Sequence, residues 1–385
     1  MTRLSLPGSA VAGQQVVPAY QSSTLADLTP GIGAHLAVPG YQQDVLRLPA
    51  SQRYVVVLID GLGFHMVRRA VQSAPYLASL LGDATVITSG VPSTTVTSLA
   101  SLGTGLPPGQ HGLVGYTSRV PGTGEILNAL TWDSSLRALD YQPKPTFFER
   151  AVAAGVAVTS VGLKRFEGSG LTEAALRGAD FSGFADEQQE DRRIDLVIAA
   201  AKRGQRSLVY AYERELDHTG HAVGSDSERW LFQLARIDAM CERLRDALPD
   251  DVRLLITGDH GMVDVPRTSQ VLAEDEPELM AGVSALAGEG RFRQVYVDSD
   301  SPEQVARRWA DRLGEMAWVR TRGEAIDDGW FGPVDDQLRE RYGHVLVAMR
   351  DSYAVMTTQS PRELELVGMH GSLTPEEMVV PLFCD

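Results

Sequence analysis

Three carboxylates and three imidazoles in this sequence have the residue types and spacing of metal ligands. They are Asp60, Asp217, His221, Asp259, His260 and His370. A mixed oxygen and nitrogen set of this size exceeds what one four-coordinate metal ion needs, but it suits two ions. Two adjacent metal ions can stabilise the attacking and leaving oxygens of a displacement at phosphorus. The set therefore indicates chemistry on a phosphoester at a two-metal site.

A hydroxyl-rich segment, VPSTTVTSLASLGTGLPPGQHG, lies between the first two of these acids. Ser93 and Thr94 are good helix N-caps, and the glycines and Pro107 further on are expected to end the helix. A hydroxyl in the first turn of a helix lies among free backbone N–H groups, where a phosphate is stabilised. Taken alone, the segment is better explained as a simple capping motif, because serine and threonine are common at helix starts. Beside metal ions, a threonine hydroxyl there could act as a nucleophile toward phosphorus.

The elements that must position these groups are buried strands. The run YVVVLI ends at Asp60, SLVYAY precedes Asp217, and VRLLIT precedes Asp259. Continuous apolar, β-branched runs of this kind are typical of strands buried on both faces of a parallel sheet. Ligands and catalytic groups gather at the carboxyl edge of such a sheet. We therefore expect the candidate ligands to meet at one edge.

The rest of the chain supports an α/β fold with a mainly parallel central sheet and helices on both faces. Apolar residues recur every three or four positions in SERWLFQLARIDAMCERLRDAL, which predicts a helix packed on the sheet. The alternation of strand and helix predicts parallel pairing. Near the N-terminus, TLADLTPGIGAHL predicts a short helix that Pro30 and Gly31 would interrupt.

The domain organisation follows from where this alternation loosens. Residues 1–50 are expected to form an N-terminal extension packed on the core. Residues 51–265 and 367–385 are expected to form the catalytic core. Residues 266–366 contain a strand, an amphipathic helix and another strand, and are expected to form a smaller inserted α+β lobe.

Composition narrows the classes of partner. The 385 residues carry a net charge of −15, so a broad electropositive surface for polymeric nucleic acid is not expected. The N-terminus lacks the apolar core of a signal peptide and no run is long enough to span a membrane, so we expect a cytoplasmic protein without a membrane partner. The two cysteines, Cys241 and Cys384, predict neither a disulfide framework nor a cysteine metal site. The oligomeric state stays open.

The order and spacing of five motifs resemble the alkaline phosphatase superfamily, most closely its type I phosphodiesterase/nucleotide pyrophosphatase branch. The motifs are VVVLIDGLG, the PSTT to TGLPPGQHG stretch, ELDHTGHAVGSDS, ITGDHGM and MHGSLTPEEMVVPL. They are spread over most of the length of the chain. The resemblance implies the alkaline phosphatase-like fold with a small α+β insertion.

The resemblance also implies a role for each candidate. It implies one zinc-like site formed by Asp217, His221 and His370, and a second formed by Asp60, Asp259 and His260. The nucleophile implied by position is Thr95, nine residues before Thr104, with Thr94 as the alternative. The expected cofactors are two divalent ions, Zn²⁺ first because imidazoles suit zinc, with Mn²⁺ as the alternative.

One departure from the family concerns the substrate. Many relatives carry an asparagine after the HGxxG segment that helps to hold a phosphate oxygen, whereas this chain has Tyr116. Tyr116, Asn128 and Lys164 are candidate substrate-binding residues, although a loop amide and a solvated lysine are the simpler readings of the last two.

The implied function is hydrolysis of a phosphodiester or pyrophosphate bond in a small phosphorylated substrate through a covalent phospho-threonine. Two alternatives stand beside it. The first is a phosphomonoesterase or phosphomutase of the same superfamily, because GSLTPEEMVVPL is similar to the C-terminus of cofactor-independent phosphoglycerate mutases. The second is a catalytically silent metal-binding scaffold. A sulfatase is disfavoured because no CxPxR or SxPxR motif surrounds Thr95.

Overall fold

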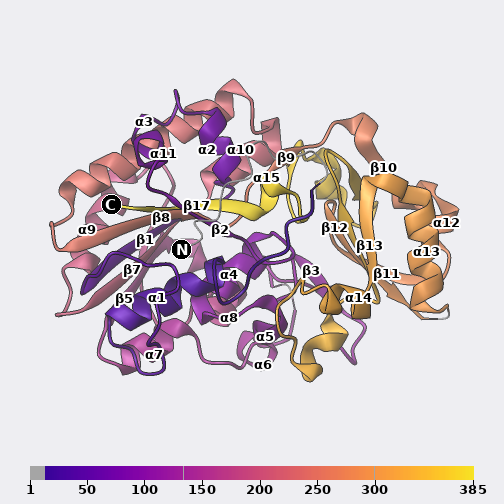
Figure 1. Cartoon of the computed structure of the whole chain (residues 1–385), viewed down its shortest axis with the longest axis horizontal. Coiled ribbons are helices and arrows are strands. Elements are labelled where there is room, and N and C mark those ends of the chain that lie inside the picture. Colours follow the sequence, from indigo (N-terminus) through magenta and orange to yellow (C-terminus); the bar gives the residue numbers. More distant parts are fainter. Residues whose placement is uncertain (1–13, 133, 299) are drawn as a thin grey trace.

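The computed structural model describes residues 14–132, 134–298 and 300–385. The first thirteen residues, for which no signal peptide is predicted, lie outside the described part. Within it, a seven-stranded sheet forms the centre of the larger part of the molecule (Figure 1). Its strand order is β2-β17-β8-β1-β7-β5-β6. The strands are β1 (Arg53–Ile59), β2 (Thr85–Thr88), β5 (Ala157–Leu163), β6 (Asp180–Phe184), β7 (Ser207–Glu213), β8 (Val252–Gly258) and β17 (Val379–Cys384).

The sheet is mainly parallel, as the sequence predicted. Strand β1 pairs in parallel with β7 on one side and with β8 on the other, and β5 continues the parallel pairing to β6. Only the C-terminal strand β17 runs antiparallel to its neighbours β8 and β2 among the described strands. Because β1 lies between two parallel neighbours, its residues are buried on both faces, which explains the unbroken apolar run.

Helices cover both faces, and successive residues of β1 contact opposite layers. Tyr54, Val56 and Leu58 belong to one apolar cluster, with α1, α4, α7 and α8. Val55 and Val57 belong to the other, with α2, α3, α9 and α11. Figure 1 shows these two layers on either side of the sheet. The helices are α1 (Leu28–His35), α2 (Phe64–Arg69), α3 (Pro75–Leu80), α4 (Thr95–Thr104), α7 (Phe147–Ala153), α8 (Gly170–Ala175), α9 (Glu190–Ala201) and α11 (Glu228–Ala247).

The prediction that Pro30 and Gly31 interrupt the first helix is wrong. Helix α1 begins at Leu28, so Pro30 is its third residue. An N–H in the first turn has no partner within the helix, and proline therefore costs no hydrogen bond there. Gly31 faces Asp44 and Leu48 so closely that a side chain would collide with them.

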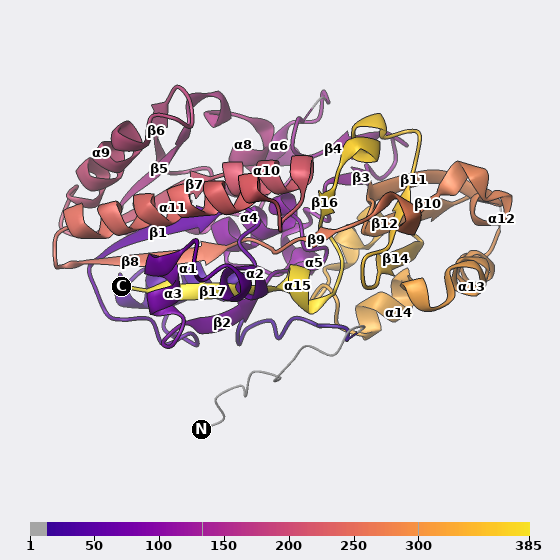
Figure 2. The ribbon, with the colours of Figure 1, turned by 90° about the horizontal axis from the view of Figure 1, so that it is seen from above.

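A second, antiparallel sheet forms a lobe at one end of the molecule (Figures 1 and 2). Its order is β11-β12-β14-β13, and Val305, Trp309 and Leu313 of α13 pack on it. All of these elements lie within the segment 266–366. The elements are β11 (Val283–Glu289), β12 (Phe292–Val297), β13 (Ala317–Thr321), β14 (Val345–Met349), α12 (Pro277–Met280), α13 (Pro302–Leu313) and α14 (Arg322–Asp327).

The remaining helices and strands are short. They are β3 (Thr117–Arg119) with β4 (Ile126–Asn128), β9 (Val263–Asp264) with β16 (Gly368–Met369), β10 (Gln270–Leu272) with β15 (Ala354–Met356), and the helices α5 (Pro108–His111), α6 (Ala138–Tyr141), α10 (Glu215–Val223) and α15 (Pro375–Met378). Among the described residues, no helix has the length and apolar character needed to cross a bilayer.

Candidate active site

The candidate ligands meet at the carboxyl edge of the central sheet. Asp60 directly follows β1, and Asp259 directly follows β8. Asp217 lies in the first turn of α10, which begins just after β7. Because β7, β1 and β8 are parallel neighbours in register, their ends bring these three acids to one place.

One group of candidate ligands contains Asp60, Asp259 and His260. Its three ligand atoms lie within 4.8 Å of one another. His260 Nε2 lies 3.4 Å from Asp60 Oδ1 and 3.5 Å from Asp259 Oδ2. Asp259 and His260 are fully buried, and Asp60 nearly so. The structure therefore brings together all three residues that the family resemblance assigns to one metal site.

The second group differs in one member from the set implied by resemblance. Asp217, His370 and again His260 have ligand atoms within 4.8 Å of one another. His221 is one helical turn beyond Asp217 in α10, and its Nε2 lies 3.2 Å from Asp217 Oδ2. His370 Nε2 lies 3.8 Å from Asp217 Oδ1. His221 thus adjoins this group through Asp217, while His260 lies between the two groups.

The three histidines present the same ring nitrogen to the site. His221 Nδ1 lies 2.7 Å from the carbonyl oxygen of Gly368, and His370 Nδ1 lies 2.9 Å from that of Ser93. His260 Nδ1 lies 3.0 Å from the carbonyl oxygen of Gly261. A carbonyl oxygen only accepts, so each Nδ1 must carry the proton and donate. Each Nε2 is left as a lone-pair donor turned toward the carboxylates, the arrangement that metal-binding histidines adopt.

Burial and mutual repulsion act on the carboxylates. Burial raises the pKa of Asp60 well above its usual value, and the charges of Asp259 and Asp217 raise it further. Burial opposes ionisation of Asp217 too, but the nearby imidazoles hold its pKa below the usual value. Asp217 Oδ1 and Asp259 Oδ2 are buried without a hydrogen-bond partner among the described residues. Buried acceptors of this kind fit cation ligands, because a bound cation would satisfy them.

Thr95 places its hydroxyl beside the side chains of these groups. Its Oγ1 lies 3.4 Å from Asp60 Oδ1 and 3.3 Å from His260 Nε2. Thr95 is the first residue of α4, and Thr94 is the N-cap. Gly105, with φ of 67°, ends the helix in the left-handed conformation that glycine adopts easily. The Thr95 hydroxyl therefore lies where free backbone N–H groups and candidate metal ligands meet.

Tyr212 is a residue of the site that the sequence analysis did not single out. Its hydroxyl donates a hydrogen bond to Asp60 Oδ2. Tyr212 is the penultimate residue of β7 and is paired in register with Leu58 of β1, so its ring reaches the same edge. The available signal was the polar hydroxyl within an apolar strand, SLVYAY, just before the edge of the sheet.

A cavity of about 910 Å³ opens above the site, between the core and the lobe. Asp60, Thr94, Thr95, Asp217 and His370 line it. This volume accommodates a small organic substrate.

The three predicted substrate residues lie differently with respect to this cavity. Tyr116 lines it, and its hydroxyl accepts a hydrogen bond of 3.0 Å from Asn128 Nδ2. Asn128 stands behind Tyr116 and is not among the lining residues. Lys164 is exposed and does not line the cavity, whereas its neighbour Arg165 does. Arg165, Arg214 and Arg362 are the cationic side chains of the lining.

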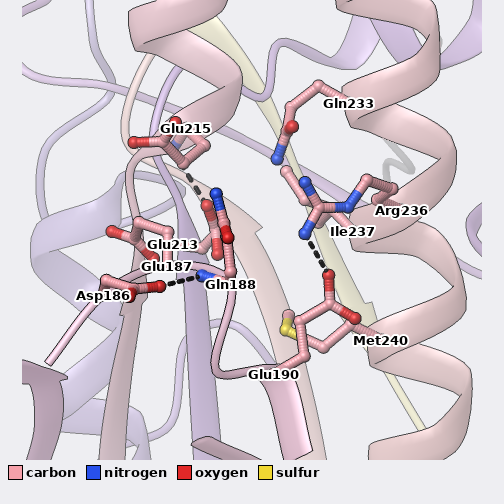
Figure 3. A pocket seen from close by; sticks show the side chains of 10 residues that line it. All are labelled: Asp186, Glu187, Gln188, Glu190, Glu213, Glu215, Gln233, Arg236, Ile237 and Met240. Carbon is pink, nitrogen blue, oxygen red and sulfur yellow. Dashed lines mark hydrogen bonds and ion pairs between the residues drawn. The ribbon is translucent and has the colours of Figure 1, made fainter. Parts of the chain in front are cut away.

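A second, smaller cavity of about 320 Å³ lies between β7, α9 and α11 (Figure 3). Acidic side chains line it, but protein donors already engage them. Glu190 accepts a hydrogen bond of 2.6 Å from Arg236, and Glu213 pairs with the buried Arg193. We therefore assign no ligand to this cavity.

The fold and the clustered ligands define an α/β protein of the alkaline phosphatase superfamily. The family "Type I phosphodiesterase / nucleotide pyrophosphatase" matches residues 54–373. The chain belongs to this family of hydrolytic enzymes, and the resemblance drawn from the motifs is confirmed.

Among curated proteins, the ectonucleotide pyrophosphatase/phosphodiesterase family member 7 of Rattus norvegicus is 29% identical over 114 residues. That match covers 28% of this chain and 26% of the rat protein, so the chain matches about a quarter of the length of this relative. The same protein of Mus musculus is 29% identical over the same length, with the same coverage.

Solved structures share the fold over much longer stretches. Murine ectonucleotide pyrophosphatase/phosphodiesterase 5 has a TM-score of 0.69 at 17% identity, covering 86% of this chain and 87% of that one. An inactive threonine-to-alanine variant of it is known in complex with AMP. Phosphonoacetate hydrolase from Sinorhizobium meliloti, in complex with phosphonoformate, also has a TM-score of 0.69, at 18% identity, covering 90% of this chain and 92% of that one.

Proposed function

We propose that this protein hydrolyses phosphodiester or pyrophosphate bonds of a small substrate through a covalent phosphoryl group on Thr95. The observation that carries the proposal is the position of the Thr95 hydroxyl. It lies at a helix N-terminus, within 3.4 Å of Asp60 Oδ1 and 3.3 Å of His260 Nε2, and it faces the large cavity. Family membership supports the bond type.

We further propose that two divalent ions, Zn²⁺ first and Mn²⁺ as the alternative, complete the site. Asp60, Asp259 and His260 would hold one ion. Asp217, His221 and His370 would hold the other, with His260 adjoining both groups. The donor set fits such ions, because three Nε2 atoms and two unpartnered carboxylate oxygens are turned toward one another. When bound, the ions supply Lewis acidity and lower the pKa of a hydroxyl close to them.

The chain's own groups account for the remaining chemistry. Thr95 Oγ1 forms a bond to phosphorus while the bond from phosphorus to the leaving oxygen breaks. The hydroxyl proton of Thr95 ends on the leaving group. The free backbone N–H groups at the start of α4 stabilise the negative charge on the phosphoryl oxygens. A water molecule then forms a bond to phosphorus while the bond from phosphorus to Thr95 Oγ1 breaks. One proton of that water ends on Thr95 Oγ1, which restores the hydroxyl.

The relatives support the nucleophile as well as the bond. In the murine relative, the replacement that accompanies inactivity exchanges a threonine for alanine, and AMP is bound in that complex. A nucleoside monophosphate is the product that cleavage of a nucleotide pyrophosphate would leave. We therefore rank nucleotide-like diesters and pyrophosphates above phosphomonoesters as substrates.

A phosphonate hydrolase is the second candidate, because phosphonoacetate hydrolase shares the fold over 90% of this chain. The deciding experiment combines elemental analysis of the purified protein with a substrate panel. The panel contains bis(4-nitrophenyl) phosphate, 4-nitrophenyl phosphate and phosphonoacetate. The proposal predicts hydrolysis of the diester first. Preference for the monoester supports a phosphatase or mutase, and release of phosphate from phosphonoacetate alone supports the second candidate. No turnover on the panel with both metals bound supports a silent scaffold.

A further inference from the structure

Two carboxyl groups of the lobe line the large cavity, and each has an oxygen without a partner. Glu289 is the last residue of β11, and Glu363 lies in the short helix Pro361–Glu365. Both line the cavity beside Tyr116, Met356 and other residues. Oε1 of Glu289 and Oε1 of Glu363 are buried and accept no hydrogen bond from any described residue. Glu363 is only 6% exposed, so solvent hardly reaches it.

Glu289 lies next to the proposed catalytic centre. Its Oε2 is 3.6 Å from His370 Nδ1. Gly371, which follows His370, has a φ of 127°, and a Cβ there would lie 2.8 Å from Glu289 Cγ. The backbone at Gly371 therefore leaves room for the carboxyl group of the lobe to reach the site.

The charges around the β11–β12 hairpin do not balance. Arg291 forms a two-bonded ion pair with Glu377, and Arg293 pairs with Glu363 through Oε2 at 2.5 Å. All four residues are buried. Among the described residues, Glu289 has no lysine or arginine partner. Arg362, the nearby cationic lining residue, is exposed to solvent, which screens its charge.

A hydrogen-bond donor with positive charge would satisfy both the free oxygen and the unbalanced charge. Buried carboxylate oxygens are costly unless they accept a hydrogen bond, and a hydrogen bond from a charged donor is the stronger kind. A primary ammonium group offers three N–H donors and one positive charge, whereas a quaternary ammonium group offers the charge alone.

We propose that Glu289, assisted by Glu363, binds a primary amino group on the substrate, so that the preferred substrates are phosphodiesters with a short aminoalkyl substituent. The proposal rests on the proposed function, because it places the phosphoryl group at Thr95. It makes Glu289 a residue that determines specificity.

The test compares three substrates that share the 4-nitrophenyl leaving group. Their second substituents are 2-aminoethyl, propyl and 2-(trimethylammonio)ethyl. With the metal-loaded wild type, kcat/KM for the aminoethyl ester should exceed that for the propyl ester by about tenfold or more, the effect of one charged hydrogen bond. The trimethylated ester should fall well below the aminoethyl ester, because it keeps the charge but has no N–H.

The Glu289→Gln variant keeps the size of the side chain and removes its charge. We expect kcat/KM for the aminoethyl ester to fall much more than that for the propyl ester, so that the preference within the variant drops below about threefold. Glu303→Gln, an exposed change on α13 of the same lobe, is the matched control and should keep the full preference. Thermal unfolding of both holo variants checks the fold.

Three results would overturn the inference. They are equal hydrolysis of the aminoethyl and propyl esters by the wild type, an equal loss on all three esters in Glu289→Gln, and a trimethylated ester as good as the aminoethyl one. If Glu289→Gln fails to fold, the inhibition of the wild type by 2-aminoethyl phosphate is compared with its inhibition by propyl phosphate. The inference predicts stronger inhibition by the amino compound, and equal inhibition refutes it. A wild type that hydrolyses none of the esters refutes the proposed function itself.

Discussion

The imidazole rings of His260 and His370 are stacked, with centroids 3.7 Å apart and 18° between their planes. His260 follows a strand of the core, and His370 follows β16 near the C-terminus. His260 belongs to both groups of candidate ligands. Two metal ions held by these groups would be close neighbours, as a clamp on one phosphoryl group requires.

Replacement of the proposed nucleophile should stop turnover without emptying the site. We expect Thr95→Ala to lower kcat on bis(4-nitrophenyl) phosphate by about 10³-fold or more, because the covalent step is lost. Elemental analysis should find both metals still bound. Thr94→Ala is the matched control, since Thr94 is the neighbouring N-cap. If Thr95→Ala keeps full activity and Thr94→Ala loses it, the nucleophile is Thr94 and not Thr95.

Metal removal should abolish activity and lower stability together. Without cations, the buried Asp60, Asp217 and Asp259 repel one another, and binding energy that favours the folded state is lost. Dialysis against a chelator should therefore lower the melting temperature by several degrees, roughly 2–4 °C for each kcal/mol lost. Separate addition of Zn²⁺ and Mn²⁺ identifies the ion that restores kcat. Unchanged activity after dialysis would contradict the two-metal proposal.

His111 should make the fold sensitive to acid. Burial, and then the charges of Arg341 and Lys144, lower the pKa of His111 to about 3. Its Nδ1 accepts a hydrogen bond from the Leu113 N–H, so only the neutral ring fits. At pH values below the ordinary pKa of histidine, His111 binds a proton in the unfolded chain but not in the folded chain. The contribution of His111 to the free energy of unfolding is therefore fully present above pH ~6.5. It is lost progressively as the pH decreases toward ~3.

The size of this effect can be measured against a variant. Between pH ~6.5 and ~4.5 the loss from His111 is roughly 2–3 kcal/mol, at 1.36 kcal/mol for each pH unit. Urea unfolding at both pH values should show this extra loss in the wild type relative to His111→Gln, which titrates at neither value. If the free energy of unfolding falls equally in the two proteins between these pH values, His111 does not cause the acid sensitivity.

The ion pair between Arg291 and Glu377 should hold the lobe hairpin against the C-terminal segment. Both side chains are fully buried, and two hydrogen bonds of 2.6 and 3.0 Å join them. Glu377→Gln leaves a buried guanidinium without its counter-charge, which costs about 3–5 kcal/mol of unfolding free energy. The double variant Arg291→Met, Glu377→Met should recover only part of this loss in urea unfolding, because Arg291 also donates to three backbone carbonyls and Glu377 also accepts from the Ser372 N–H. A single variant as stable as the wild type would contradict the account.

The strand-to-acid pattern was enough to predict where the first ligands meet. Asp60 and Asp259 end neighbouring parallel strands, and such strands must end at the same edge. The shared position of His260 could not be predicted, because it depends on the turn after Asp259 and on the stack with His370. A linear motif does not record contacts between segments so far apart.

The packing of the lobe on the core determines features of the cavity that the sequence alone does not predict. Glu289 reaches the site only because the β11–β12 hairpin packs on the core and Gly371 leaves space for it. Similarly, the cavity wall contains Arg165 rather than Lys164, since one residue decides which way a side chain points after β5. The effect of Pro30 on its helix could not be predicted either, because it depends on the residue at which the helix begins.

The central claim is a phosphoryl group carried by Thr95, and mass spectrometry of enzyme quenched in acid during turnover tests it directly. Metal-loaded protein is mixed with bis(4-nitrophenyl) phosphate, quenched and digested. The peptide that contains Thr95 should carry the added mass of one 4-nitrophenyl phosphoryl group, and fragmentation should locate this group on Thr95. The Thr95→Ala protein should lack it. Turnover with the modification on Thr94, or with no modified peptide at any quench time that resolves the first cycle, would contradict the account.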